Sequence, residues 1–136
     1  MTSPTRILAP EGVAPGNGYS HVVWGTGRFV AISGQCALDE KGAVVGEGDV
    51  RAQADQVFEN LRRCLASAGA TFEDVVKLTY FVTDIAHLPA VRAARDAVLT
   101  PEQLPASSAV QVSALFRPEL LVEIEAFAVT DPAGHA

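Results

Sequence analysis

Residues 49–69 read DVRAQADQVFENLRRCLASAG, and residues 74–83, a few positions later, read DVVKLTYFVT. In the first stretch apolar residues recur every three or four positions, which places them on one face of an α-helix. This face consists of Val50, Ala54, Val57, Leu61, Cys64, Leu65 and Ala68. Asp49 is a good N-cap residue and Gly69 is a typical stop signal, so the stretch predicts an amphipathic helix from Asp49 to Ala68.

The second stretch predicts a strand, because residues at alternate positions share one side of an extended chain. That side carries Val76, Leu78, Tyr80 and Val82. A second helix is expected from about Ile85 to Leu99, ended by Pro101, with Leu88, Val91, Ala94, Ala97 and Val98 facing inward. Two further strands, at about Ser107–Ala114 and Leu121–Val129, close the chain.

The N-terminal part predicts shorter strands. One is expected at Arg6–Leu8 and an edge strand at Ala43–Val45. Two runs rich in β-branched and aromatic residues, Tyr19–Trp24 and Arg28–Ser33, flank Gly25-Thr26-Gly27 and predict a hairpin. The order of these elements predicts an α+β fold, a two-layer sandwich with two helices on one face of a mixed β-sheet.

Size and charge narrow the class of protein. A chain of 136 residues and 14.3 kDa, 49% hydrophobic and 19% charged, fits a single globular domain over residues 1–136. Ten Lys and Arg against 16 Asp and Glu give a net charge of −6, which argues against nucleic-acid binding. With no long apolar run and no signal sequence, we expect a cytoplasmic protein that does not bind membranes. Both cysteines are expected to be reduced thiols, Cys64 in the helix core and Cys36 more exposed in a loop.

The last predicted strand is apolar on both sides. Val122, Ile124, Ala126 and Ala128 can face the helices, but the opposite side is also mostly apolar: Leu121, Glu123, Glu125, Phe127 and Val129. No predicted helix remains to cover that side. We therefore expect identical subunits to pack their sheets together.

A small set of side chains could carry chemistry. Glu123 and Glu125 point the same way, and a carboxylate partly buried at a subunit boundary can act as a general acid or base. The alternative is that one of them pairs with an arginine of a neighbouring chain. Ser33 and Gly34 end a predicted strand where the backbone can approach a ligand closely, and Tyr19 follows a glycine-rich loop.

Two kinds of bound group are not expected. The histidines His21, His87 and His135 are isolated from one another and from cysteine, so no metal site is predicted. The glycine pairs lack the spacing of a nucleotide-binding loop, so no nucleotide site is predicted.

Five linked segments between Tyr19 and Val129 resemble the RidA/YjgF family. They are Ile32-Ser33-Gly34-Gln35, the helix with Gln53 and Asn60-Leu61 ending at Ala68-Gly69-Ala70, the strand from Asp74 to Asp84, Leu104-Pro105-Ala106-Ser107-Ser108, and Val122-Glu123-Ile124-Glu125-Ala126. The resemblance implies a chorismate-mutase-like fold, a homotrimer with small-molecule clefts between subunits, and hydrolysis of reactive imines or enamines without a cofactor. It also implies that Glu123 holds the attacking water and that Tyr19, Ser33 and Gly34 line the cleft.

The chain departs from the family pattern at the segment expected to bind the substrate carboxylate. Where the family has Pro-Ala-Arg-Ser-Cys, this chain has Ser107 in place of the arginine and Ala109 in place of the cysteine. Arg117 and Arg28 are candidates for a replacement cation. Two alternatives stay open. The first is a non-catalytic ligand-binding or regulatory trimer that kept the scaffold after losing the arginine. The second, in poor agreement with the charge, is an endoribonuclease, as some family members are described.

Overall fold

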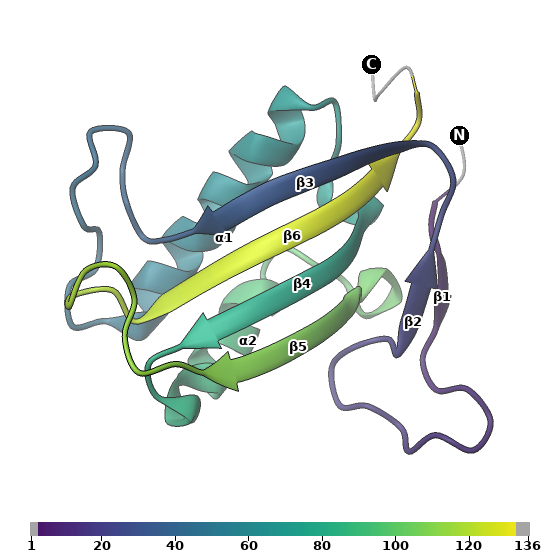
Figure 1. The fold of residues 1–136 in the computed structure, drawn as a ribbon, viewed down its shortest axis with the longest axis horizontal. Helices are drawn as coiled ribbons and strands as arrows, with labels where there is room; N and C mark the ends of the chain where they lie inside the picture. Colours follow the sequence, from purple (N-terminus) through teal and green to yellow (C-terminus); the bar gives the residue numbers. More distant parts are fainter. Residues whose placement is uncertain (1–2, 133–136) are drawn as a thin grey trace.

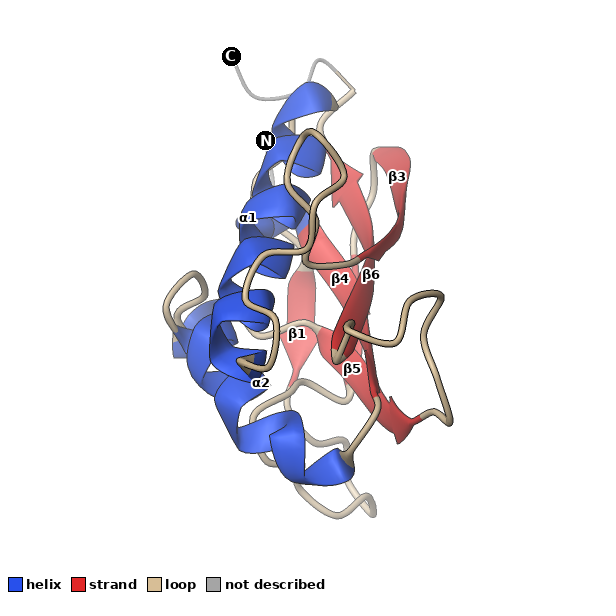
Figure 2. Ribbon diagram, turned by 90° about the vertical axis from the view of Figure 1, so that its left-hand side faces the viewer, coloured by secondary structure: helices blue, strands red, loops and turns tan. Residues whose placement is uncertain are grey.

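The computed structural model describes residues 3–132 and consists of a four-stranded sheet with two helices on one of its faces (Figures 1 and 2). The strand order is β3-β6-β4-β5, in which β4 and β5 are parallel and the other pairs antiparallel. A separate pair, β1-β2, lies beyond one end of this sheet. The strands are β1 (Thr5–Ile7), β2 (Val22–Trp24), β3 (Arg28–Gln35), β4 (Val75–Val82), β5 (Ala106–Gln111) and β6 (Val122–Thr130). The predicted α+β class and mixed sheet are confirmed.

The long helix α1 (Val50–Ser67) has the extent and the cap predicted for it. The side chain of Asp49 accepts a hydrogen bond from the backbone N–H of Ala52 at 3.0 Å. The apolar face of α1, including Val57, Leu61 and Leu65, is fully buried against the sheet. The shorter helix α2 (Leu88–Asp96) packs beside α1 on the same face of the sheet (Figure 2).

The predicted hairpin between residues 19–24 and 28–33 is wrong. β2 pairs with β1, placing Val23 opposite Arg6, whereas β3 pairs with β6. The chain turns between the two sheets at Gly27, whose φ of +138° is a conformation that favours glycine. A Cβ at Gly27 would lie only 2.1 Å from the carbonyl oxygen of Thr130, so the close approach of β6 also requires glycine here.

The second helix is shorter than the spacing of apolar residues predicts. A short 3₁₀ turn (Ile85–His87) precedes it, and another (Pro101–Gln103) comes well after its end. Because the helix ends at Asp96, Ala97 and Val98 are exposed rather than inward, and Leu99 turns into the core instead.

Two strand predictions change in detail. An irregularity in the pairing of β4 with β6 between Val75 and Lys77 buries Val75 where Val76 was expected to be. The predicted edge strand at residues 43–45 is reduced to a single bridge between Leu38 and Val44. A further 3₁₀ turn, Phe72–Asp74, leads into β4.

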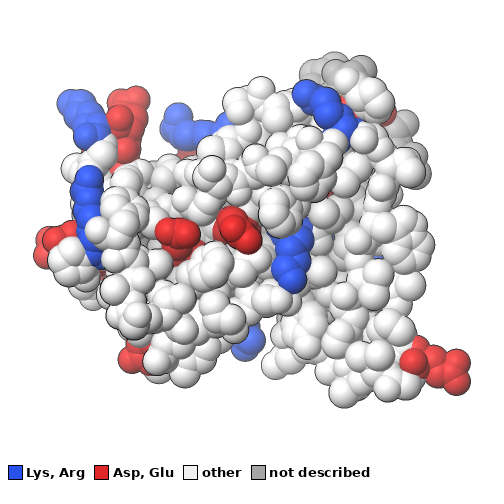
Figure 3. All heavy atoms as spheres, viewed as in Figure 1, with Lys and Arg blue, Asp and Glu red and all other residues white. Residues whose placement is uncertain are grey.

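The two faces of the sheet differ as the last strand predicts. Val122, Ile124, Ala126 and Ala128 are buried beneath the helices. No helix within residues 3–132 packs on the opposite face, where Phe29 is 64% exposed and stacks on Phe127. Figure 3 shows this open face as a mostly uncharged surface with acidic side chains, and a basic one beside them, near its middle. No helix in this part of the chain is long and apolar enough to cross a bilayer.

Candidate functional site

Glu123 lies on the open face of β6, opposite the irregular end of β3, where its carboxylate is held on both sides. The thiol of Cys36 donates a hydrogen bond to its Oε1 at 3.3 Å. Its Oε2 lies directly over Gly34, where a Cβ would approach to 2.3 Å. Only glycine fits that position without moving the carboxylate, so Gly34 and Cys36 together fix the orientation of Glu123.

Cys36 and Cys64 each lie in the environment that the sequence predicts for the other. The pairing of β3 with β6 is irregular between Ile32 and Gln35, and Cys36, just beyond it, turns into the core with 6% exposure. Burial, and then the hydrogen bond and negative charge of Glu123, raise the pKa of the Cys36 thiol to about 12. Cys64 lies at the edge of the helix face and is partly exposed.

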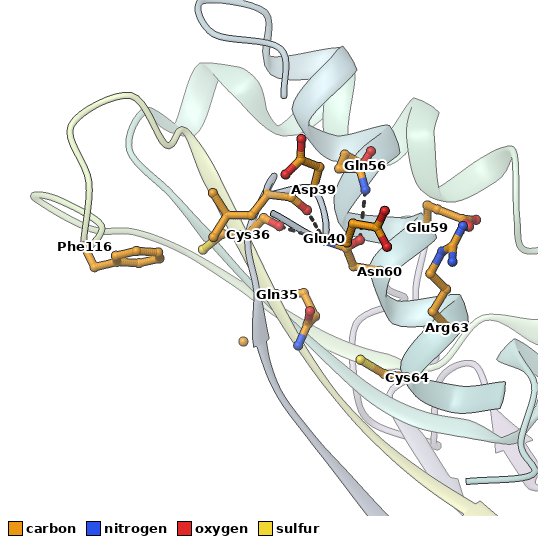
Figure 4. Close-up of a pocket in the computed structure, with 12 residues that line it drawn as sticks. Gln35, Cys36, Asp39, Glu40, Gln56, Glu59, Asn60, Arg63, Cys64 and Phe116 are labelled. Carbon is orange, nitrogen blue, oxygen red and sulfur yellow. Dashed lines mark hydrogen bonds and ion pairs between the residues drawn. The ribbon is translucent and has the colours of Figure 1, made fainter. Parts of the chain in front are cut away.

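Polar side chains of α1 hold the loop that follows β3. The Asn60 side chain donates hydrogen bonds to the carbonyl oxygens of Cys36 and Leu38, both at 3.0 Å, and accepts one from Gln56 at 2.9 Å. An open groove of about 820 Å³ lies between this loop and the helix (Figure 4). Gly34 and Cys36 line the groove and contact Glu123, so the groove borders the carboxylate.

Tyr19, Ser107 and Ala109 meet at a second place. In the parallel pairing of β4 with β5, Ser107 lies opposite Leu78 and Ala109 opposite Tyr80, which are buried on the helix side. Beside them a pocket of about 350 Å³ lies between β5, α2 and the loop before β2. Its lining comprises Asn17, Gly18, Tyr19, Tyr80, Leu88, Val91, Arg92, Ser107, Ser108 and Ala109.

Hydrogen bonds from neighbouring residues place Tyr19 in this pocket. Ser20 binds the start of β5, its backbone N–H donating to Pro105 O at 3.1 Å and its hydroxyl to Leu104 O at 2.7 Å. The buried Arg95 of α2 donates to Gly18 O at 2.6 Å and pairs with Asp96 at 2.9 Å. The loop before Tyr19 is therefore fixed to both α2 and β5.

The predicted site residues thus form two groups. Ser33, Gly34 and Glu123 lie on the open-face side of the sheet, and Tyr19, Ser107 and Ala109 lie on the helix side. Neither of the two arginines proposed as replacement cations lines the pocket or contacts Glu123. Arg117 donates to Gly42 O at 3.0 Å and lies over the Phe116 ring, while Arg28 donates to Ala68 O.

Two lining residues of the pocket, Arg92 and Tyr80, are not among those that the sequence predicts for the site. Arg92 is four positions after Leu88, and residues four apart share one side of a helix. Tyr80 is predicted to face inward, where a hydroxyl needs a partner. The signal that could have revealed this pair is a charged residue, Arg92, at the border of the inward-facing side of α2, opposite a buried tyrosine, Tyr80.

No cluster of three or more His, Cys, Asp or Glu side chains suited to a metal ion occurs within the described residues. His21 contacts the carbonyl oxygen of Ala14 at 2.7 Å and the Tyr19 ring edge-on. His135 lies outside the described residues.

Comparison with known proteins gives a consistent answer. Residues 10–130 match the family described as Endoribonuclease L-PSP. The chain is 40% identical over 105 residues to a 2-iminobutanoate/2-iminopropanoate deaminase of Salmonella typhimurium, covering 76% of this chain and 80% of the other. It is 35% identical over 125 residues to the 3-aminoacrylate deaminase RutC of Acinetobacter baylyi, covering 92% and 98%.

A solved structure of a Rid-family protein of unknown function, YyfB from Yersinia pestis, is similar in fold as well as in sequence. The TM-score is 0.81 at 41% identity, with 91% of this chain and 97% of the other covered. The resemblance drawn from the five sequence segments is therefore confirmed. On these grounds the chain belongs to the Endoribonuclease L-PSP family, the family of the RidA, YjgF and RutC proteins.

Proposed function

We propose that this protein hydrolyses small reactive imines or enamines to a carbonyl compound and ammonia, with Glu123 positioning the attacking water. The observation that carries the proposal is the fixed carboxylate of Glu123, held by Cys36 on one oxygen and by Gly34 beneath the other. Relatives that cover most of the chain and are named as imine or aminoacrylate deaminases support the reaction class.

The chemistry needs one group that can take and return a proton. Hydrolysis bonds the water oxygen to the imine carbon, and the C–N bond breaks as the nitrogen leaves as ammonia. Glu123 would accept a proton from the attacking water and deliver it to the nitrogen, as a general base and then a general acid. The second proton that ammonia needs comes from the new hydroxyl group, which loses it as the C=O bond forms and the C–N bond breaks. An enamine follows the same route after it tautomerises to the imine. Because a carboxylate oxygen has two lone pairs, the bond from Cys36 still leaves room for the water.

The site would be complete only between copies of the chain. Glu123 and the Tyr19–Ser107 pocket lie on opposite sides of the sheet, and the open face has no cover among the described residues. A homotrimer that buries the open faces would bring the Glu123 of one copy toward the pocket of the next, forming clefts at the subunit boundaries. The ligand of such a cleft would be a small molecule and no cofactor would take part.

The test is ammonia release from freshly generated iminopropionate, measured in a coupled assay. Glu123→Gln should abolish turnover, because the amide cannot take the proton. Glu125→Gln, two positions along the same face, is the matched control and should retain most of the activity. Turnover that survives Glu123→Gln would refute the assigned role, and absence of turnover in the unaltered protein would favour the non-catalytic ligand-binding alternative.

An endoribonuclease activity, the alternative in the family's description, has less support. The net charge is −6, and all three arginines of α1 pair with Asp55 or Glu59 on the helix surface. RNA cleavage with salt-dependent affinity would overturn this assessment.

A further inference from the structure

The pocket between β5 and α2 is built from hydrogen-bond donors and apolar groups. Arg92, Tyr80 and Ser107 are among its polar lining residues, and none of the described residues that line it is Asp or Glu. In a chain with six more acidic than basic residues, a pocket with a cation and no carboxylate is notable. Such a lining favours a negatively charged or acceptor group over a cation.

The Tyr80 hydroxyl needs a hydrogen-bond acceptor. Tyr80 is only 4% exposed, and its hydroxyl has no partner of good geometry within residues 3–132. Burial raises the pKa of Tyr80, so the phenol keeps its proton at neutral pH. The neighbouring Arg95 can only donate and already binds Gly18 O and Asp96. A bound acceptor would satisfy the phenol O–H.

Arg92 is likewise uncommitted. Its side chain makes no hydrogen bond or ion pair within the described part of the chain, although it is half-buried. By contrast, Arg51, Arg62, Arg63 and Arg95 each pair with a carboxylate. A half-buried guanidinium without a counter-charge is an incomplete arrangement that a ligand carboxylate would complete with two parallel hydrogen bonds.

We propose that this pocket binds the carboxylate of the ligand, with Arg92 as the pairing cation and the Tyr80 hydroxyl as a second donor. Leu88, Val91 and Ala109 form an apolar wall for the rest of the molecule. This inference rests on the proposed function and assigns the two side chains that would hold the carboxylate of its substrate. It also assigns the cation of the site to α2 rather than to Arg28 or Arg117.

Binding can be tested without turnover by using a stable ketone in place of the imine. Calorimetric titration with 2-oxobutanoate and with its neutral amide should show preference for the acid. Arg92→Gln should weaken binding of the acid about 10- to 100-fold, the effect of losing a charge-assisted bond, and leave the amide unaffected. Tyr80→Phe should weaken it about 3- to 10-fold.

Two further variants separate the pocket's charge from general effects. Arg51→Gln removes an equal charge from the surface of α1 and should leave acid binding unchanged. Adding Ser107→Arg to Arg92→Gln places a guanidinium on the opposite wall of the same pocket and should restore part of the lost affinity. Circular dichroism identifies any variant that fails to fold, and Tyr80→Phe, a change of one atom, then serves as the test.

The outcomes distinguish this inference from the proposed function. Equal binding of acid and amide, no binding of the acid, or the same loss in Arg92→Gln as in Arg51→Gln would overturn the carboxylate site. Acid binding that depends on Arg92 would uphold it even if ammonia release were never observed, in which case only the deaminase proposal would fail.

Discussion

At the scale of single residues, the contact between Cys36 and Glu123 makes a pH-dependent prediction. The pKa of the folded-state thiol, about 12 against an ordinary value of 9.0, means that folding favours the protonated form. Its contribution to stability is therefore complete below about pH 9 and is lost as the pH rises through 12. Thermal melts between pH 8 and pH 11 should show a steeper alkaline loss in the unaltered chain than in Cys36→Val.

The same contact can be measured directly by thiolate absorbance in a Cys64→Ser background. Glu123→Gln should lower the pKa of Cys36, because the carboxylate charge is removed. The value should still exceed 9.0, because burial is the largest cause of the shift. An equal pKa of Cys36 in the unaltered chain and in Glu123→Gln would show that the carboxylate does not contact the thiol in solution.

Gly34 makes a second residue-scale prediction. Because a Cβ would lie 2.3 Å from Glu123 Oε2, Gly34→Ala should displace the carboxylate and lower the proposed deaminase activity about 100-fold. Gly25→Ala is the matched control, since its nearest neighbours would be 3.7 Å away. Equal activities of the two variants, both folded, would show that Glu123 tolerates the displacement.

The spacing of residues predicts which side chains share a face but not how far a neighbouring element shifts them. Glu123 and Glu125 follow from strand alternation alone. The burial of Cys36 depends on the irregular pairing of β3 with β6, which local sequence does not indicate. The role inferred for Arg92 depends on its distance from a phenol on another element, and that proximity is a product of tertiary packing.

At the scale of elements, α1 fixes the segments on both sides of the Glu123 site through polar side chains. The fully buried Gln53 donates to Glu119 O at 2.9 Å and to Gly46 O at 3.2 Å, and accepts from the Leu121 N–H at 2.8 Å. Asn60 holds the loop after β3 in the same way. The helix therefore determines where β6 begins and how Glu123 is presented.

Gln53→Leu should consequently be strongly destabilising, because three backbone groups would lose their partner. We expect a loss of about 2–4 kcal/mol and a fall in Tm of roughly 10 °C. Gln56→Leu, on the same helix, removes only the bond to Asn60 and should cost at most about 1 kcal/mol. Chemical denaturation of the two variants gives the comparison, and similar losses would contradict the anchoring role of Gln53.

Elements defined by local chemistry are predicted well, and their partners are predicted less well. The sequence of α1 combines regularly spaced apolar residues, an N-cap and a C-terminal stop signal in one continuous stretch. The predicted extent of this helix is therefore correct almost to the residue. The hairpin is wrong because two β-rich runs separated by glycines specify strands but not their pairing. β2 pairs with β1, across the loop that precedes it, and β3 pairs with β6 at the other end of the chain.

At the scale of the whole molecule, the open face of the sheet predicts self-association. Phe29 and Phe127 stack there, and no helix of residues 3–132 lies above them. Light scattering should give about three times the chain mass, and Phe127→Asp should yield folded monomers, because a buried charge opposes packing of the faces. Val98→Asp, at an exposed position on the helix side, should leave the mass unchanged. A monomeric unaltered protein at micromolar concentration would refute the trimer.

A complementation experiment tests whether the association of copies of the chain completes the catalytic site. If each cleft takes Glu123 from one copy and Arg92 from the next, the variants Glu123→Gln and Arg92→Gln are defective for different reasons at every cleft. In trimers assembled at random from equal amounts of both, about a quarter of the clefts would combine an intact Glu123 with an intact Arg92. Co-expression should therefore restore about a quarter of the ammonia-releasing activity at limiting substrate. A site contained within one copy would regain nothing, because every copy carries one of the two lesions. Mixed trimers no more active than their parents would thus place both residues in one subunit's site.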